Sequence, residues 1–308
     1  MANAKINLFE GGRKSPPTKK GKYRFFSIRT AFILFALAPA LIHLLVFWLG
    51  VQVESIRMAF TDINTEKLGL GNFEWVLNAL RNPREPLGEG FKNTLIFFTM
   101  GVCMMPVSLF VVYLIYKKCF MSNLLRILIY LPGAICGMMM PLLFKNIIRS
   151  DFVREFFGGA DLLGVQYALK TILTYDIWMA LGSNLVIWLG AMGRIPPDVL
   201  EYGKLDGIGP FKEFIHIILP LIWPTFVTML TLQIIGIFGS SGSVMIFTEG
   251  KNGTYTISYW LYDVVYNRAS AQMQRLAVAA GLLLTVVSIP IVIIGRLIMN
   301  KFGEAVEY

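Results

Sequence analysis

Few side chains in this sequence have the types and spacing that catalysis or metal binding requires. Its two histidines, His43 and His216, are too few for a histidine-based metal centre. Its three cysteines, Cys103, Cys119 and Cys136, lie 16 and 17 residues apart without a Cys-x-x-Cys pair, so neither a zinc site nor a disulfide scaffold is indicated. No glycine-rich loop ends in Gly-Lys-Ser or Gly-Lys-Thr, the phosphate-binding motif of many ATPases. We therefore expect this chain to bind no metal or cofactor and to hydrolyse no nucleotide itself.

Carboxylates are concentrated in one segment, residues 194–220, which reads RIPPDVLEYGKLDGIGPFKEFIHIILP. Its acidic residues are Asp198, Glu201, Asp206 and Glu213. Pro197 suits a first helical turn and Asp198 favours the positive end of a helix. Gly207 and Pro210 stop a helix. The segment therefore predicts a short helix, a sharp break and a second helix, which could dock on a partner; the alternative is an ordinary surface loop.

The amino-acid composition indicates the class of protein to which this segment belongs. Hydrophobic residues make up 56% of the 308 and charged residues 15%, and the mean hydropathy is +0.62. A soluble domain has about 25% charged residues. This balance excludes a disordered chain, a collagen and an ordinary soluble enzyme, and it indicates a membrane protein.

Six apolar stretches are candidates to cross a hydrocarbon core of about 30 Å, for which a helix needs about 20 residues. The expected spans are about 30–53, 93–116, 127–144, 173–193, 221–238 and 276–295. The fourth stretch is free of charge only from 177 to 193, and its helix is expected to begin near Leu173. Within the charge-free stretches the titratable side chains are His, Tyr and Cys, which disfavours a proton-coupled pump. We therefore expect an all-α integral membrane fold with six transmembrane helices in a domain over 30–300.

The distribution of the net charge of +9 indicates an orientation. With a cytoplasmic N-terminus, 16 basic and 7 acidic residues fall in the inner segments, which are 1–29, 117–126, 194–213 and 296–308. Twelve of each sign fall in the outer segments, which are 54–92, 145–176 and 249–275. Both termini are therefore expected in the cytoplasm, as a basic disordered tail over 1–29 and a short tail over 301–308. The positive excess indicates topology and anchoring on the lipid bilayer, with no nucleic-acid partner.

The 194–220 segment also matches a known pattern. Glu201 is followed by Tyr202-Gly203, three further residues, Gly207, nine residues, Ile217, one residue and Leu219-Pro220. This spacing resembles the EAA loop of permease subunits of binding-protein-dependent ABC importers, in which Glu-Ala-Ala, three residues, Gly, nine residues and Ile precede one residue and Leu-Pro. The sequence departs from that pattern only in having Tyr-Gly in place of Ala-Ala.

Other segments resemble the sugar branch of that family, the maltose and glycerol-phosphate permease type. Residues 206–211, with the sequence Asp-Gly-x-Gly-Pro-Phe, resemble this branch. Two segments near the second span, Gly71 to Trp75 and Phe91 to Leu95, also resemble it. Two segments before the sixth span, 256–259 and 269–271, do so as well. The resemblance covers about residues 30 to 300.

The resemblance implies the type I ABC importer permease fold, in a bacterial plasma membrane. The 194–220 segment would be a cytoplasmic coupling loop whose short helix docks on a dimer of separate ATPase chains, which bind ATP and Mg. A second homologous permease subunit would complete the pathway. An extracellular solute-binding protein would dock on 54–92 and 249–275. The residues expected at the ATPase are Glu201, Tyr202, Gly203, Leu205, Asp206, Gly207, Leu219 and Pro220.

Polar residues in the otherwise apolar spans four to six are candidates for the wall of a solute cavity. They are Ser183, Asn184 and Gln233, with Trp188 as a stacking face for a sugar ring. The alternatives are that the polar side chains hydrogen-bond between helices and that Trp188 only packs.

The function expected is therefore a sugar or oligosaccharide permease that moves its solute by alternating access. Two alternatives remain at this stage. One is a permease of the same superfamily for a non-sugar solute. The other is an integral-membrane enzyme, which would need a cluster of carboxylates or histidines at one membrane face, whereas the acidic cluster here is confined to one loop.

Overall fold

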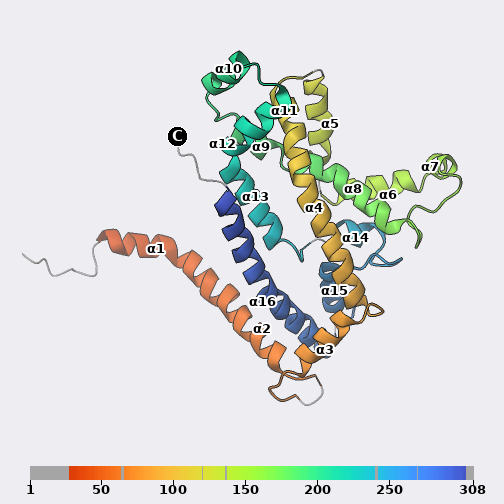
Figure 1. Cartoon of the computed structure of the whole chain (residues 1–308). Helices are drawn as coiled ribbons and strands as arrows, with labels where there is room; N and C mark the ends of the chain where they lie inside the picture. The colour runs from red at the N-terminus through yellow and green to blue at the C-terminus, as the bar shows by residue number, and fades with distance from the viewer. Residues whose placement is uncertain are drawn as a thin grey trace, which may run out of the picture. The chain divides into compact units, whose positions relative to one another are not determined.

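The described part of the chain is helical apart from loops and one isolated bridge between Thr61 and Leu68. The structure is a computed structural model that describes residues 28–63, 66–119, 121–135, 137–239, 242–268 and 270–302 (Figure 1). Two compact units can be distinguished, residues 1–54 and 55–308. Helix α1 (Ile28–His43) continues through the π-helical turn η1 (Leu44–Leu49) into α2 (Gly50–Phe60), and the boundary between the units falls within α2.

The second unit contains the remaining helices. Its first half has α3 (Gly71–Arg81), α4 (Pro86–Tyr116), α5 (Ser122–Ala134), α6 (Met139–Ile148), α7 (Asp151–Phe156), α8 (Ala168–Ser183) and α9 (Leu185–Met192). Its second half has α10 (Pro197–Leu205), α11 (Pro210–Glu213), η2 (Phe214–Ile218), α12 (Leu219–Leu221), α13 (Trp223–Ile235), α14 (Gly242–Phe247), α15 (Ile257–Tyr262), η3 (Asp263–Asn267) and α16 (Ala271–Phe302).

Within the described residues, four helices are long and apolar enough to cross a membrane. They are Thr30–Phe60, Pro86–Tyr116, Ala168–Met192 and Ala271–Lys301. A fifth candidate is the pair Pro210–Leu221 and Trp223–Ile235, which is bent by 77°. Four of the expected spans thus coincide with long helices, and the chain has the architecture of a multi-pass membrane protein. Helix α4, with 31 residues, is about 46 Å long, longer than the hydrocarbon core is thick.

The span expected at 127–144 is not one helix in the structure. Helix α5 ends at Ala134, Ile135 has an extended backbone, and α6 begins only at Met139. The hydropathy pattern did not predict this break because the residues on both sides are apolar. The span expected at 221–238 is also shorter and bent, because Ile222 leaves the helical conformation just before Trp223 and Pro224.

Helix α4 organises the second unit. Figure 1 shows that it extends from the end where α5, α10 and α11 lie to the end where α3 and α15 lie. At the first end its residues Leu109, Val112 and Tyr113 are fully buried in one apolar cluster with Trp188 and Ile218. At the other end Leu87 packs in a second cluster that includes side chains of α3, α15 and α16.

Three polar side chains join loops to the ends of helices. The buried Asn72 Nδ2 donates to the carbonyls of Ala59 and Thr61, at 3.0 and 2.8 Å. Asn93 Nδ2 donates to the carbonyls of Gly253 and Tyr255, at 3.0 and 2.8 Å. Thr94 Oγ1 accepts from the Ile257 amide at 3.0 Å. These contacts give a physical reason for the polar residues in the 71–75 and 91–95 segments. Asn72 binds the end of α2, and Asn93 and Thr94 hold residues 253–257 against α4.

Candidate functional site

The 194–220 loop has the local structure that its sequence predicts. Helix α10 begins at Pro197 and ends at Leu205, and α11 begins at Pro210. Between them Gly207 has a φ of +68°, a left-handed conformation that favours glycine. The Ile208 amide donates to the Gly203 carbonyl at 3.1 Å, which closes the end of α10.

The two faces of α10 differ. Glu201 is exposed, and the side chains of Tyr202 and Leu205 are 69% and 81% exposed. Gly203 is buried, and a Cβ there would lie 2.8 Å from Ile217 Cδ1, so glycine permits α10 to pack closely on η2. Tyr202 thus points away from this contact, and α10 presents Tyr202 and Leu205 to the outside together with two acidic residues, Asp198 and Glu201.

The loop is attached to α4 by polar and aromatic contacts. The Glu213 side chain, only 4% exposed, pairs with Lys117 Nζ at 2.7 Å, just beyond the end of α4. Tyr113 Oη donates to the Pro210 carbonyl at 3.1 Å. Phe110 packs edge-on against Phe214, with ring centroids 5.1 Å apart. The loop is therefore held against the end of α4 by an ion pair, a hydrogen bond and an aromatic contact.

This arrangement corrects one part of the sequence interpretation. Glu213 was grouped with the acidic residues of a docking surface, but its side chain is buried toward α4. Of the eight residues expected at the ATPase, six are exposed, five of them in or just after α10: Glu201, Tyr202, Leu205, Asp206 and Gly207. Gly203 and Leu219 pack within the chain, and Pro220 is exposed in α12.

A cavity of about 390 Å³ lies among α4, α8 and α13. Three of the residues expected in the solute cavity, Ser183, Asn184 and Gln233, line it together. Asn184 lies between α8 and α9, where the helix is interrupted. The other polar lining side chains are Ser108, Asp176 and Ser243, and four methionines supply thioether surface: Met100, Met104, Met105 and Met179.

Glycine 101 determines how Gln233 reaches this cavity. A Cβ at Gly101 would lie 2.5 Å from Gln233 Nε2, a distance that no real side chain tolerates. The absence of a side chain on α4 therefore makes room for the amide from α13.

Trp188 does not line this cavity. Its side chain has no exposed surface, and it stacks on Phe226 with ring centroids 6.2 Å apart. Trp188 was expected as a stacking face for a sugar ring, but in this structure its indole packs in the apolar cluster between α4, α9 and η2.

Asp176 is the cavity residue that the sequence interpretation missed. Its Oδ2 accepts a hydrogen bond from Ser243 Oγ at 3.0 Å, so the carboxylate joins α8 to the start of α14. The span expected at 173–193 includes Asp176, although its charge-free stretch begins only at residue 177. The list of titratable groups in the charge-free stretches therefore does not contain this carboxylate.

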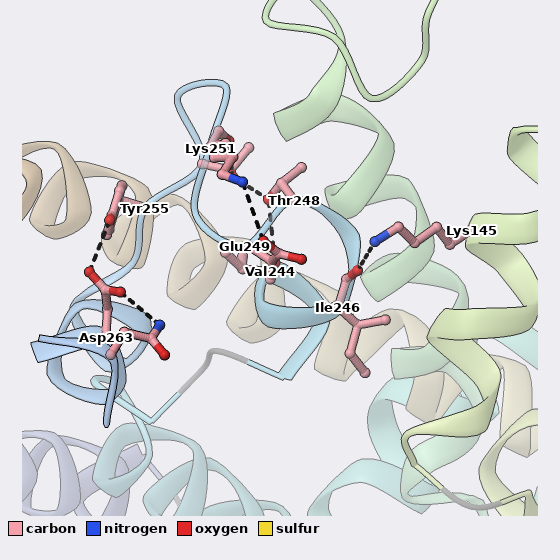
Figure 2. Close-up of polar contacts among 10 residues, drawn as sticks. Lys145, Val244, Ile246, Thr248, Glu249, Lys251, Tyr255 and Asp263 are labelled. Atoms are coloured by element: carbon pink, nitrogen blue, oxygen red, sulfur yellow. Dashed lines mark hydrogen bonds and ion pairs between the residues drawn. The ribbon is translucent and has the colours of Figure 1, made fainter. Parts of the chain in front are cut away.

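A second, polar cavity of about 460 Å³ lies beside α6, α7 and the turn after α14. Its charged lining residues are Lys145, Arg149, Arg154, Asp161, Glu249 and Lys251. Figure 2 shows Lys145 directed at the Ile246 carbonyl, to which it donates, and Lys251 paired with Glu249 at 3.3 Å.

Tyr255 and Tyr259 lie close to the Asp263 carboxylate, next to this turn. Tyr255 Oη donates to Asp263 Oδ2 at 3.2 Å, as Figure 2 shows. Burial, with the Asp263 carboxylate nearby, raises the pKa of Tyr255, and it raises the pKa of Tyr259 to about 12. Both phenols therefore remain neutral at physiological pH and act as packing and hydrogen-bonding groups.

Curated proteins with similar sequences are transport permeases. The chain is 27% identical over 286 residues to the probable starch degradation products transport system permease protein AmyD of Thermoanaerobacterium thermosulfurigenes, covering 87% of this chain and 94% of the relative. It is 24% identical over 296 residues to the arabinooligosaccharides transport system permease protein AraP of Bacillus subtilis strain 168, covering 91% and 92%.

Solved structures share the fold. A chain of a bacterial ABC transporter involved in the import of the acidic polysaccharide alginate superimposes with a TM-score of 0.75 at 19% identity, covering 90% of this chain and 98% of that one. A chain of the alginate transporter in complex with its pentasaccharide-bound periplasmic protein gives a TM-score of 0.73 at 20% identity, covering 90% and 97%.

The family model for the binding-protein-dependent transport system inner membrane component matches residues 94–306, which include α4 from Thr94 onward, the 194–220 loop and α16. This match covers more than half of the chain. The chain therefore belongs to the family of inner membrane components of binding-protein-dependent transport systems, and it is a transport subunit rather than an enzyme.

Proposed function

We propose that this chain is one of two permease subunits of an ATP-driven importer that takes up a sugar or oligosaccharide. The observation that carries the proposal is the exposed face of α10, braced on α4 by the Lys117–Glu213 pair. The names of the relatives, which transport starch degradation products and arabinooligosaccharides, support the solute class.

In the proposed topology the chain crosses the membrane six times and both termini are cytoplasmic. The third crossing is made by the broken pair α5 and α6, and the fifth by the bent pair that ends with α13. The excess of basic residues in the segments assigned to the cytoplasm supports this orientation. The 194–220 loop then lies in the cytoplasm, within reach of an ATPase.

In the proposed mechanism, partner chains bind and hydrolyse ATP, and this chain forms part of the solute pathway. ATP and Mg bind to two partner ATPase chains, whose closure moves the docked α10 helices. Tyr113, Lys117 and Glu213 pass this movement to α4, which itself lines the cavity through Phe97 to Ser108. Because the ATPase holds α10 differently in its two states, the binding of ATP can shift the equilibrium between inward-open and outward-open cavities.

The solute-binding protein is proposed to dock at the other end of the chain, on residues 54–92 and 249–275. Two features support this. Asn93 and Thr94 fix residues 253–257 in one conformation. The polar cavity next to them offers Arg149 and Arg154, for which the described residues provide no partner. A partner with acidic side chains could fill it.

The substitution Glu201→Lys tests the docking role of α10. It places a cation where the proposal has a carboxylate facing a basic groove, and loss of a close charge pair at an interface typically costs about 2–5 kcal/mol. We expect solute uptake and co-purification of the ATPase to be lost, with normal membrane insertion of the chain. The matched control is Glu155→Lys, an exposed glutamate on α7. Normal uptake in the Glu201 variant would contradict the proposal.

A further inference from the structure

The cavity among α4, α8 and α13 carries one charged side chain. Asp176 lines it, and its only hydrogen bond among the described residues is the one that it accepts from Ser243. No Lys, Arg or His is among the described residues that line the cavity, and no ion pair involving Asp176 occurs in the described part of the chain. The carboxylate is therefore not neutralised by this chain.

The remaining lining is neutral. Asn184 and Gln233 offer amides that can both donate and accept, and Ser183 offers a hydroxyl. The methionine thioethers supply an apolar surface. A carboxylate and amides beside an apolar wall suit a molecule with many hydroxyl groups and apolar C–H faces, and the volume of 390 Å³ lies in the range of small-molecule sites, roughly 300–1,000 Å³.

We infer that Asp176 makes this cavity selective for neutral or amino-bearing carbohydrates and against carboxylated or phosphorylated ones. A hydroxyl or ammonium group can donate to the free lone pairs of Asp176. An anionic group in the same place meets the like charge of a partly buried carboxylate, where repulsion is stronger than in bulk water.

The inference rests on the proposed function, because it assigns the solute class of the same cavity. It also predicts a different solute charge from that of some relatives. A permease of Pectobacterium atrosepticum is named for sn-glycerol-3-phosphate, and one of Bacillus subtilis for polygalacturonan and rhamnogalacturonan. Sequence similarity alone is compatible with anionic solutes, whereas the charge in this cavity opposes them.

The test measures the charge preference of the cavity without knowing the solute. The complete transporter is assembled with Ser183→Cys, a conservative change at an exposed lining residue, after Cys103, Cys119 and Cys136 and the accessible cysteines of the partners are replaced by alanine. Rates of modification by trimethylammonium-ethyl and sulfonatoethyl methanethiosulfonates, which are cationic and anionic, are each divided by the rate with free cysteine.

We expect the cationic reagent to be favoured at residue 183, and Asp176→Asn to lower this preference by roughly tenfold. The matched control is Glu155→Gln, which removes an exposed carboxylate on α7 that lines neither cavity and should leave the preference unchanged. An equal preference with and without Asp176 would overturn the inference, and so would a residue 183 that neither reagent reaches. Accumulation of trigalacturonate as readily as maltotriose would also overturn it.

The proposed function fails by a different result. If the Glu201→Lys variant keeps normal uptake, the docking role is wrong whatever the charge preference at residue 183. If Glu201→Lys abolishes uptake and Asp176→Asn changes nothing, the importer assignment stands and only the selectivity of the cavity is wrong.

Discussion

At the scale of single residues, glycines determine where the side chains of other elements can lie. Gly101 leaves room on α4 for the amide of Gln233, and Gly203 lets α10 approach Ile217. Neither position has a positive φ, so the reason for glycine is space rather than backbone conformation. Substitution at these sites should therefore act through a displaced neighbour.

The substitution Gly101→Ala tests whether the space at Gly101 is needed for Gln233 to contribute to the cavity. The new methyl group displaces the Gln233 amide, and loss of one hydrogen bond of about 1 kcal/mol should raise the KM of uptake about fivefold. The ATPase should still co-purify, because the 194–220 loop is untouched. The control is Gly190→Ala in α9, where an added Cβ meets nothing within 4 Å. If both variants transport like the parent, Gln233 does not contribute to solute binding.

At the scale of elements, α4 links the two ends of the second unit. Tyr113 and Lys117 bind the 194–220 loop at one end, and Asn93 and Thr94 bind residues 253–257 at the other. The same helix lines the solute cavity between these contacts. A rigid α4 therefore provides a continuous physical connection from the loop that we assign to the ATPase to the surface that we assign to the binding protein.

Reversal of the Lys117–Glu213 pair tests the first connection. Lys117→Glu leaves two carboxylates facing each other with one buried, and loss of one partner of a buried pair costs about 3–5 kcal/mol. We expect a lower melting temperature and less uptake per ATP hydrolysed. The double exchange Lys117→Glu with Glu213→Lys should restore part of both.

The control is Lys118→Glu, which reverses the charge of the neighbouring lysine, an exposed residue. A Lys117→Glu transporter whose uptake per ATP is unchanged would show that this pair does not carry the movement.

The substitution Asn93→Ala tests the second connection. It removes the donor to the Gly253 and Tyr255 carbonyls, which are left without their partner, at about 1–3 kcal/mol. Residues 249–257 should then be cut faster by protease in the assembled transporter. The control Asn78→Ala changes an exposed residue of α3. Equal rates of cleavage in the two variants would contradict the role of Asn93.

The sequence predicts local features better than pairings between distant residues. The α10–break–α11 structure follows from Pro197, Gly207 and Pro210, whose effects are local. The pairing of Glu213 with Lys117 and of Asp176 with Ser243 depends on how helices pack, so the sequence offered no sign of either. Hydropathy could not reveal the break between α5 and α6, because it separates two apolar segments.

At the scale of the whole molecule, the proposed function requires a sidedness. We propose that the 194–220 loop and both termini lie in the cytoplasm, and that residues 54–92, 145–176 and 249–275 lie outside. This sidedness is required because the ATPase and the solute-binding protein must meet opposite ends of α4. One chain provides half of a pathway, so the cavity is expected to close only with a second permease subunit.

Crosslinking at Leu205 tests whether α10 docks on the ATPase on the cytoplasmic side of the membrane. Leu205 is 81% exposed at the end of α10, and it can be replaced by cysteine in a chain without its native cysteines. In intact cells, Leu205→Cys is predicted to crosslink to the co-expressed ATPase and to resist a membrane-impermeant thiol reagent added from outside. Labelling of residue 205 from outside, or an ATPase that never crosslinks to it, would contradict the account.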